Sequence, residues 1–168
     1  ELVYSGTLRT NVAALVDKVP LDDSWYRVAS ELFAISADIQ MVLENIQEED
    51  YTCHTPDGAG TSREECMRRI ARVVCSDLDI LTPYDIISIS EFVHLKQVET
   101  ISEALMEVSK RTDIRRVVTT GLGMDIIGKK ASEFAGLPSV GMDQLLSKDE
   151  CVVAPAVGTA SLMWEFLR

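Results

Sequence analysis

Several features that mark membrane, nucleic-acid-binding or secreted proteins are missing from this sequence. It has no apolar run of the roughly 18 residues that a membrane-spanning helix needs, and no basic-then-apolar leader. Basic residues are scarce, with 16 Lys and Arg against 27 Asp and Glu, and the formal net charge is −11. Phosphate backbones and anionic lipids select basic faces. We therefore expect neither nucleic-acid nor membrane partners, and a cytoplasmic location.

Metal-binding and disulfide patterns are missing as well. The four cysteines, Cys53, Cys66, Cys75 and Cys151, form no CxxC pair, and the two histidines do not stand at zinc-ligand spacing from them. We therefore expect no structural zinc site, and we expect the thiols to be reduced. Cys66 and Cys75 fall on the apolar stripe of one predicted helix, which favours small packed residues. His94 lies between apolar neighbours, so a packed or surface histidine is favoured over a catalytic one.

The sequence does contain enough apolar material for one sizeable core. Of its 168 residues, 46% are hydrophobic, which suffices for a core that can divide into two lobes. The chain begins with Glu1, and residues 2–4 already resemble a strand with no lead-in. We therefore expect the chain to be part of a longer polypeptide.

Residues 1–47 form the first expected region, a hairpin followed by a helix. Two extended stretches flank residues 20–24, whose Asp-Asp-Ser sequence favours a turn. From Ala34, apolar residues recur at three- and four-residue steps. This spacing predicts an amphipathic helix to about residue 46, with Asp38 on it.

Residues 48–112 form the second expected region, a loop and a helical insertion. EEDYTCHTPDGAGT, residues 48–61, is polar and broken by proline and glycine, which predicts an exposed loop that is either functional or merely solvated. SREE is a capping-box pattern before a helix at 63–76. TPYD begins another helix, which we expect to break near residues 94–96.

Residues 113–168 form the third expected region, in which strand and helix alternate. The pattern predicts strands at 116–120, 139–141 and 151–154, with helices between them and a final helix from 156. Such alternation is typical of an α/β fold with a parallel or mixed sheet.

Two junctions in this region lead from a predicted strand into a helix. In TTGLG, residues 119–123, bare backbone N–H groups could hold an anionic or nucleotide-like ligand, and a simple tight turn is the alternative. This junction is neither a GxGxxG fingerprint nor a P-loop. In VVAPAVGTAS, small residues permit close approach of a ligand or of a packed helix.

Five phrases cover nearly all of the chain: ELVYSGTLRTNVAALV, ASELFAISADIQMVL, TPDGAGTSREECMRRIARVVCSD, VVTTGLGMDIIGKKASEFAGLPSV and VAPAVGTASLMWEFL. In content and order they resemble the hydantoinase-and-oxoprolinase-like family, in its branch of tetrahydromethanopterin-linked C1-transfer and methanofuran-biosynthesis proteins. Two positions depart from the family pattern. Asn11 stands where we expect proline, and Met124 stands where we expect an acidic residue.

The resemblance implies half of an actin-like ATPase or sugar-kinase (ribonuclease H-like) fold with a helical insertion, completed by an N-terminal half of the same protein. It implies a transferase that joins an aminomethyl-furanmethyl diphosphate to the phenol oxygen of γ-glutamyltyramine and releases pyrophosphate. The negative net charge adds the expectation of a divalent metal, Mg²⁺, to accompany this phosphorylated small-molecule substrate. Association into a homo-oligomer stays open.

The candidate site residues come from these motifs. Arg9, between Thr7 and Thr10, is the candidate cation for a phosphate, with an ordinary surface arginine as the alternative. Asp38 and Asp57 are candidate bases or metal ligands, although a helix-surface Asp and a turn-forming Asp-Gly pair explain them as simply. The remaining candidates for substrate or phosphate binding are Thr120, Gly121, Gly123, Pro155 and Gly158.

Two other classes of function stay open. The same fold serves ATP-dependent kinases and hydantoinase-like enzymes, and the residues that decide between them would lie in the other half. The second alternative is a non-catalytic binding module.

Overall fold

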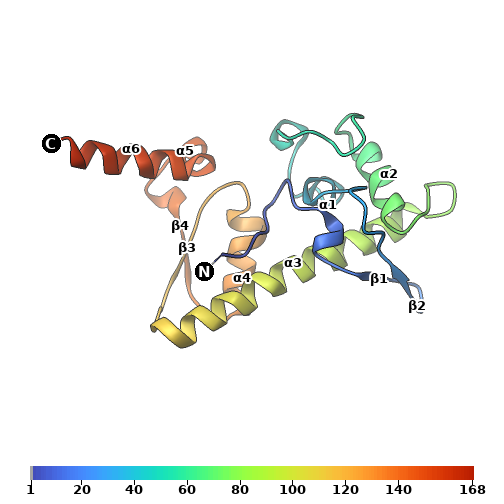
Figure 1. Ribbon diagram of the computed structural model, residues 1–168, viewed down its shortest axis with the longest axis horizontal. Helices are drawn as coiled ribbons and strands as arrows, with labels where there is room; N and C mark the ends of the chain where they lie inside the picture. Colours follow the sequence, from blue (N-terminus) through green and yellow to red (C-terminus); the bar gives the residue numbers. More distant parts are fainter. Residues whose placement is uncertain (1) are drawn as a thin grey trace. The chain divides into compact units, whose positions relative to one another are not determined.

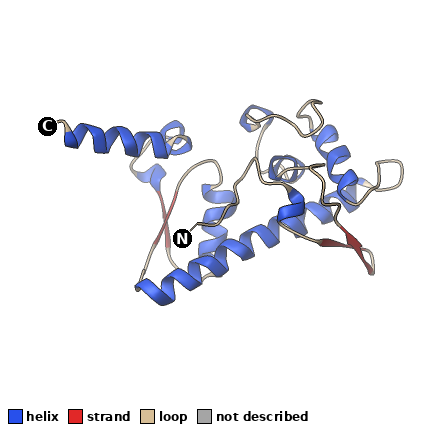
Figure 2. Cartoon of the chain, in the orientation of Figure 1, coloured by secondary structure: helices blue, strands red, loops and turns tan. Residues whose placement is uncertain are grey.

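The computed structural model describes residues 2–168, which divide into one compact unit up to Thr100 and a second from Ile101 to Arg168. Helices make up most of the chain, and the strands are short (Figure 2). Within residues 2–168, none of the helices combines the length and hydrophobicity that a membrane span requires. The chain is a mixed α/β structure, and its predicted three-region division stays a prediction.

The elements follow one another along the chain as coloured in Figure 1. The first unit holds η1 (Val12–Ala14), β1 (Lys18–Leu21), β2 (Ser24–Arg27), α1 (Ser36–Val42), η2 (Glu48–Asp50), α2 (Arg63–Val73) and α3 (Pro83–Thr112) as far as Thr100. The second unit holds the rest of α3, β3 (Val117–Thr119), the π-helical turn η3 (Met124–Gly128), α4 (Lys129–Phe134), β4 (Ser139–Gly141), η4 (Met142–Gln144), α5 (Lys148–Val152) and α6 (Ala154–Phe166).

Strands β1 and β2 form the predicted hairpin. They pair antiparallel with Leu21 opposite Ser24, and Asp22 in the turn has a φ of +50°, the left-handed conformation that tight hairpin turns use. The prediction of a strand at residues 2–4 was wrong. Ser5 N–H donates to the Val3 carbonyl at 2.9 Å, so a local turn takes the place of a ladder with a second strand.

Helix α1 packs against α2 and is buried on every side. A helix enclosed in this way must satisfy its polar side chains inside the protein. Ser36 Oγ accepts from the Thr10 N–H at 3.1 Å, and Gln40 Oε1 accepts from Asn45 Nδ2 at 2.8 Å. Asp38 is the third polar residue of α1, and its partners form the centre of the candidate site.

The predicted capping box at SREE and the predicted helix start at TPYD are confirmed. The Glu65 amide donates to Ser62 Oγ at 3.4 Å, and the Ser62 N–H donates to the Glu65 carboxylate at 3.2 Å, at the start of α2. Thr82 and Asp85 make the same reciprocal pair at the start of α3.

The predicted break in α3 was wrong, because the helix is continuous through residues 94–96. That stretch, His-Leu-Lys, contains neither proline nor glycine, which are the usual causes of a kink. His94 is buried, and its Nδ1 lies 3.2 Å from Gln40 Nε2, so it packs into the core of the first unit.

In the second unit, β3 and β4 pair in parallel, with Val117 opposite Ser139. The predicted parallel sheet is therefore present as two strands. The predicted strand at residues 151–154 was wrong, because α5 and α6 occupy this stretch. The Glu150 amide donates to Ser147 Oγ at 3.3 Å, and the Ser147 N–H donates to the Glu150 carboxylate at 2.8 Å. This capping box starts a helix just where a strand was expected.

Candidate functional site

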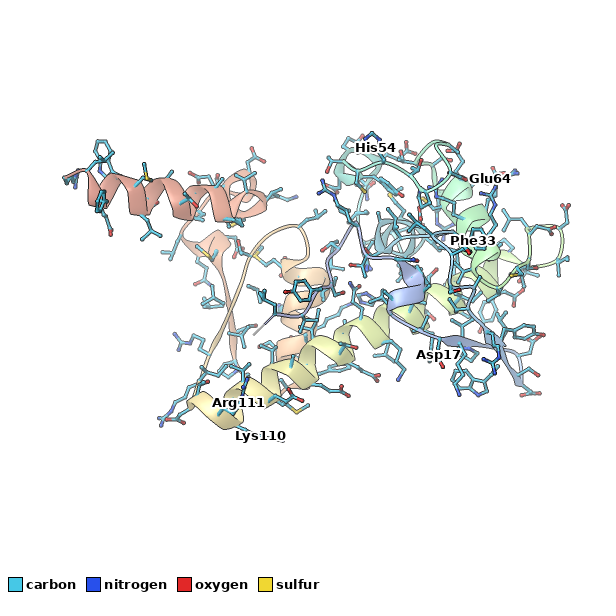
Figure 3. All side chains as sticks on the ribbon, in the orientation of Figure 1. Asp17, Phe33, His54, Glu64, Lys110 and Arg111 are labelled. Carbon is cyan, nitrogen blue, oxygen red and sulfur yellow. The ribbon has the colours of Figure 1, made fainter. Side chains whose placement is uncertain are left out.

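A cavity of about 750 Å³ opens beside Arg9 in the first unit. Its walls are Arg9, Leu32, Ile35 and residues 51–56, which follow η2 in the chain. Cavities of this size are typical of sites for small molecules. His54, on this wall, lies on the outer side of the loop that connects η2 to α2 (Figure 3).

Backbone hydrogen bonds fix the segment that carries Arg9 against α1. The Leu8 carbonyl accepts from the Ala37 N–H at 3.0 Å, and the Thr10 carbonyl accepts from the Ser36 N–H at 2.7 Å. Arg9 lies between these two anchors and has an exposed side chain. Its backbone is therefore held in place, while its guanidinium faces the cavity and solvent.

Of the three candidates in this segment, Arg9 is the one that lines the cavity. Thr10 Oγ1 accepts from the Gly6 N–H at 2.8 Å, which closes a local turn around the arginine. Thr7 is half-buried within the same turn. We interpret the two threonines as residues that shape the chain on either side of Arg9.

A buried ion pair lies beside the cavity, and its cation was not among the sequence candidates. Arg69 of α2 and Asp38 of α1 are both fully buried, and Nε and Nη2 of Arg69 lie 2.9 and 2.8 Å from Oδ1 of Asp38. The Tyr51 hydroxyl donates to the same oxygen at 2.9 Å, and the Ile35 N–H donates to Asp38 Oδ2 at 2.9 Å. Asp38 is thus joined to two residues of the cavity wall.

Arg69 also holds the far end of the loop formed by residues 51–61, which we call the 51–61 loop. Its Nη1 donates to Asp57 Oδ1 at 3.1 Å and to the Gly60 carbonyl at 3.0 Å, while Arg72 donates to Asp57 Oδ2 at 2.8 Å. One buried guanidinium therefore connects both helices to the middle and end of the loop, while Asp38 holds its start through Tyr51.

These contacts set the charge states of the cluster. Burial and the charge of Asp38 raise the pKa of Tyr51, so its hydroxyl stays a donor. Partial burial alone would raise the pKa of Asp57, but hydrogen bonds from the Ala59 amide, Arg72 and Arg69 outweigh it and hold that pKa below its usual value. Asp57 therefore stays ionised at neutral pH.

The two candidate carboxylates do not fit a metal site. The oxygens of Asp38 and Asp57 accept from arginines and other protein donors. Within residues 2–168, no group of three or more His, Cys, Asp or Glu side chains is placed to hold a metal ion. The geometry of both acids is that of groups that position the 51–61 loop, and a role as catalytic base stays a prediction.

The glycine junction in the second unit follows the end of β3. Gly121 has a φ of +83°, a conformation that residues with side chains rarely adopt. Gly121 and Gly123 are half-buried, and within residues 2–168 their N–H groups donate to no protein acceptor. Thr120 is exposed, and its hydroxyl donates to the Cys151 carbonyl at 3.2 Å. These two amides therefore have no protein acceptor among the described residues, and their role in anion binding stays a prediction.

The other two candidates of the second unit, Pro155 and Gly158, lie in α6. Pro155 stands in the first turn of that helix, where its missing N–H is harmless. No described atom lies within 4 Å of a Cβ built at Gly158. Within residues 2–168, no other helix or side chain packs closely against Gly158, although its small size would permit this.

Comparison with known proteins places the chain in a family. Residues 1–166 match the family described as Hydantoinase/oxoprolinase. A protein of Methanocaldococcus jannaschii named (4-{4-[2-(gamma-L-glutamylamino)ethyl]phenoxymethyl}furan-2-yl)methanamine synthase is 37% identical over 163 residues, which are 97% of this chain and 48% of that protein. A protein of the same name from Methanococcus vannielii is 32% identical over 166 residues, covering 97% of this chain and 75% of that protein.

The chain therefore spans about half the length of the first relative and three quarters of the second. The match to the family covers both units and the whole of the cavity and the glycine junction. On this match, the chain belongs to the hydantoinase/oxoprolinase family.

Proposed function

We propose that this chain forms part of a transferase that joins an aminomethyl-furanmethyl diphosphate to the phenol oxygen of γ-glutamyltyramine, as in methanofuran biosynthesis. The observation that carries the proposal is the 37% identity over 97% of the chain to a synthase whose name describes such an ether product. Family membership supports the further proposal that the two units form half of an actin-like fold with a helical insertion, which an N-terminal half completes.

The reaction makes one bond and breaks one. A C–O bond forms between the furan methylene carbon and the phenol oxygen, and the bond from that carbon to the diphosphate oxygen breaks with its electron pair. The phenol proton passes to a base or to water. Because charge develops on the departing pyrophosphate, fixed N–H donors and cations beside it stabilise the transition state.

Two groups of residues are candidates to bind the anionic groups of the two substrates, one in each unit. In the second unit, the N–H groups of Gly121 and Gly123 are the candidates for the diphosphate, and Thr120 can join them once its hydroxyl turns from the Cys151 carbonyl to the ligand. In the first unit, Arg9 is the candidate anion-binding group. A divalent metal that accompanies the diphosphate would need ligands other than Asp38 and Asp57, because arginines occupy both.

The test is a product assay with three readouts. The chain, and the longest natural polypeptide that contains it, are incubated with both substrates and Mg²⁺, and mass spectrometry follows the ether while a coupled assay follows pyrophosphate. We expect ether and pyrophosphate in equal amounts. Release of ADP from added ATP without ether would instead support a kinase or hydantoinase-like enzyme. Absence of any turnover from the longest polypeptide would leave the non-catalytic binding module.

A further inference from the structure

We propose that the cavity beside Arg9 binds the acceptor, a small molecule that carries one carboxylate on an aromatic body, and not the diphosphate donor. This inference rests on the proposed function and assigns one of its substrates to one site. The relatives' printed product name contains a γ-glutamyl group, with its free carboxylate, joined through an aminoethyl chain to a phenoxy ring.

The charge of the cavity suits a single carboxylate. Of the described residues that line it, Arg9 alone is an arginine or lysine. A guanidinium matches the two oxygens of one carboxylate through parallel hydrogen bonds. A diphosphate monoester is polyanionic, and its binding sites usually combine several cations, backbone amides or metal ions. One exposed arginine therefore fits the acceptor better than the donor.

Asp38, the acid that is bonded to two residues of the cavity wall, does not oppose this charge match. Asp38 is ion-paired with the fully buried Arg69. Cys53, on the cavity wall, stays a neutral thiol, because burial raises its pKa even though the charge of Arg9 acts against that rise. Its neutral sulfur leaves the charge of the Arg9 guanidinium available to a ligand.

The remaining walls suit an aromatic body. Ile35 and Tyr51 are buried and held rigidly, since the Ile35 amide and the Tyr51 hydroxyl both donate to Asp38. Leu32 also lines the cavity, and 54% of its surface is exposed to solvent. An aromatic ring lying between Arg9 and this wall would cover Leu32 and gain apolar contact with the Tyr51 ring.

Calorimetric titration of the chain with three probes tests the proposal: γ-glutamyltyramine, tyramine and inorganic pyrophosphate. Arg9→Gln removes the cation, Leu32→Ser removes the apolar contact, and Arg27→Gln is the matched control, an exposed arginine outside the cavity. All three positions are exposed, so the fold should survive, and circular dichroism checks it. We expect γ-glutamyltyramine to bind, and Arg9→Gln to weaken it about tenfold to a hundredfold, as for a lost charged hydrogen bond.

The other combinations separate the carboxylate from the ring. Tyramine lacks the carboxylate and carries an ammonium, so it should bind the unaltered chain more weakly than γ-glutamyltyramine does, and Arg9→Gln should not weaken its binding. Leu32→Ser should weaken both γ-glutamyltyramine and tyramine, and Arg27→Gln should weaken neither. Pyrophosphate affinity should not change in Arg9→Gln.

Two results would overturn the inference. One is failure of γ-glutamyltyramine to bind, and the other is loss of pyrophosphate affinity in Arg9→Gln with γ-glutamyltyramine unaffected, which would make the cavity a phosphate site. The proposed function fails separately. If γ-glutamyltyramine binds through Arg9 but the longest polypeptide makes no ether, the acceptor site is supported and the proposed reaction is refuted. If ether forms while Arg9→Gln changes only the KM for the diphosphate, the proposed reaction is supported and the acceptor site is refuted.

Discussion

Replacement of Arg69 by methionine tests whether one buried guanidinium holds the walls of the cavity together. The substitution removes the contacts of that group to Asp38, to Asp57, to the Gly60 carbonyl and to the Cys66 sulfur. Methionine is flexible and similar in volume to arginine, although it is shorter, so loss of packing is the minor part of the effect. The major part is that Asp38 is left fully buried without its cation.

Removal of one partner from a buried ion pair typically costs about 3–5 kcal/mol. Folded domains are stable by only about 5–15 kcal/mol in total. Arg69→Met should therefore lower the urea midpoint of the first unit by a large fraction of its value, and circular dichroism measures this midpoint. Amide hydrogen exchange should also accelerate in the 51–61 loop, because Asp57 and Gly60 lose the donor that they share.

Arg68→Met is the matched control. Arg68 precedes Arg69 in the same helix, but its side chain is 59% exposed and its ion pair is with the exposed Glu64. Exposed pairs of this kind contribute little to stability. We expect an unchanged midpoint and unchanged exchange in the 51–61 loop. Equal effects of the two substitutions, or a normal 51–61 loop in Arg69→Met, would refute the role assigned to the buried pair.

Three further predictions concern single positions. Ser62→Ala removes the cap of α2 and should lower the free energy of unfolding by about 1 kcal/mol, measured by urea denaturation. The folded-state pKa of Asp57 is depressed, so its contribution to the free energy of unfolding is complete above the unfolded-state pKa of about 3.9 and is lost as the pH falls through the lower folded-state pKa. The free energy of unfolding of Asp57→Asn, measured against pH in the acid range, should lack this loss. Gly121→Ala should destabilise the second unit by about 1–2 kcal/mol, because its φ is +83°, whereas Gly158→Ala, in the open helix α6, should stabilise by about 0.5–1 kcal/mol.

Helix starts were the features that the sequence predicted best, because a capping box is local. SREE and TPYD each place a hydroxyl and a carboxylate three residues apart, and both begin helices at the expected positions. SKDE, residues 147–150, has the same form and was not used, so the β-branched CVV that follows it was assigned to a strand. The local cap decided the outcome over the preference of valine for strands.

The candidate site was only partly predictable, because its partners are distant in sequence. Asp38, Asp57 and Arg9 could be chosen by residue type, but the contact between Asp38 and Arg69 spans 31 positions. A signal did exist: Arg69 lies on the inward stripe of α2 between Cys66 and Val73, where a charged residue needs a buried partner. That signal predicts that some acid is nearby, and tertiary packing decides which one.

A buried ion pair is a weak source of stability compared with an apolar pair of the same volume, so stability alone does not explain the Arg69–Asp38 pair. We infer that the pair serves to position the cavity wall. Asp38→Asn with Arg69→Met removes both charges and leaves an amide oxygen for the Tyr51 hydroxyl. We expect this double variant to regain most of the stability that Arg69→Met loses. Arg69→Met should also weaken the binding of γ-glutamyltyramine. The double variant should not recover that affinity, because Asp57 and Gly60 still lack the donor that fixes the 51–61 loop. Recovery of both stability and affinity would mean that the pair fills space and does not position the cavity wall.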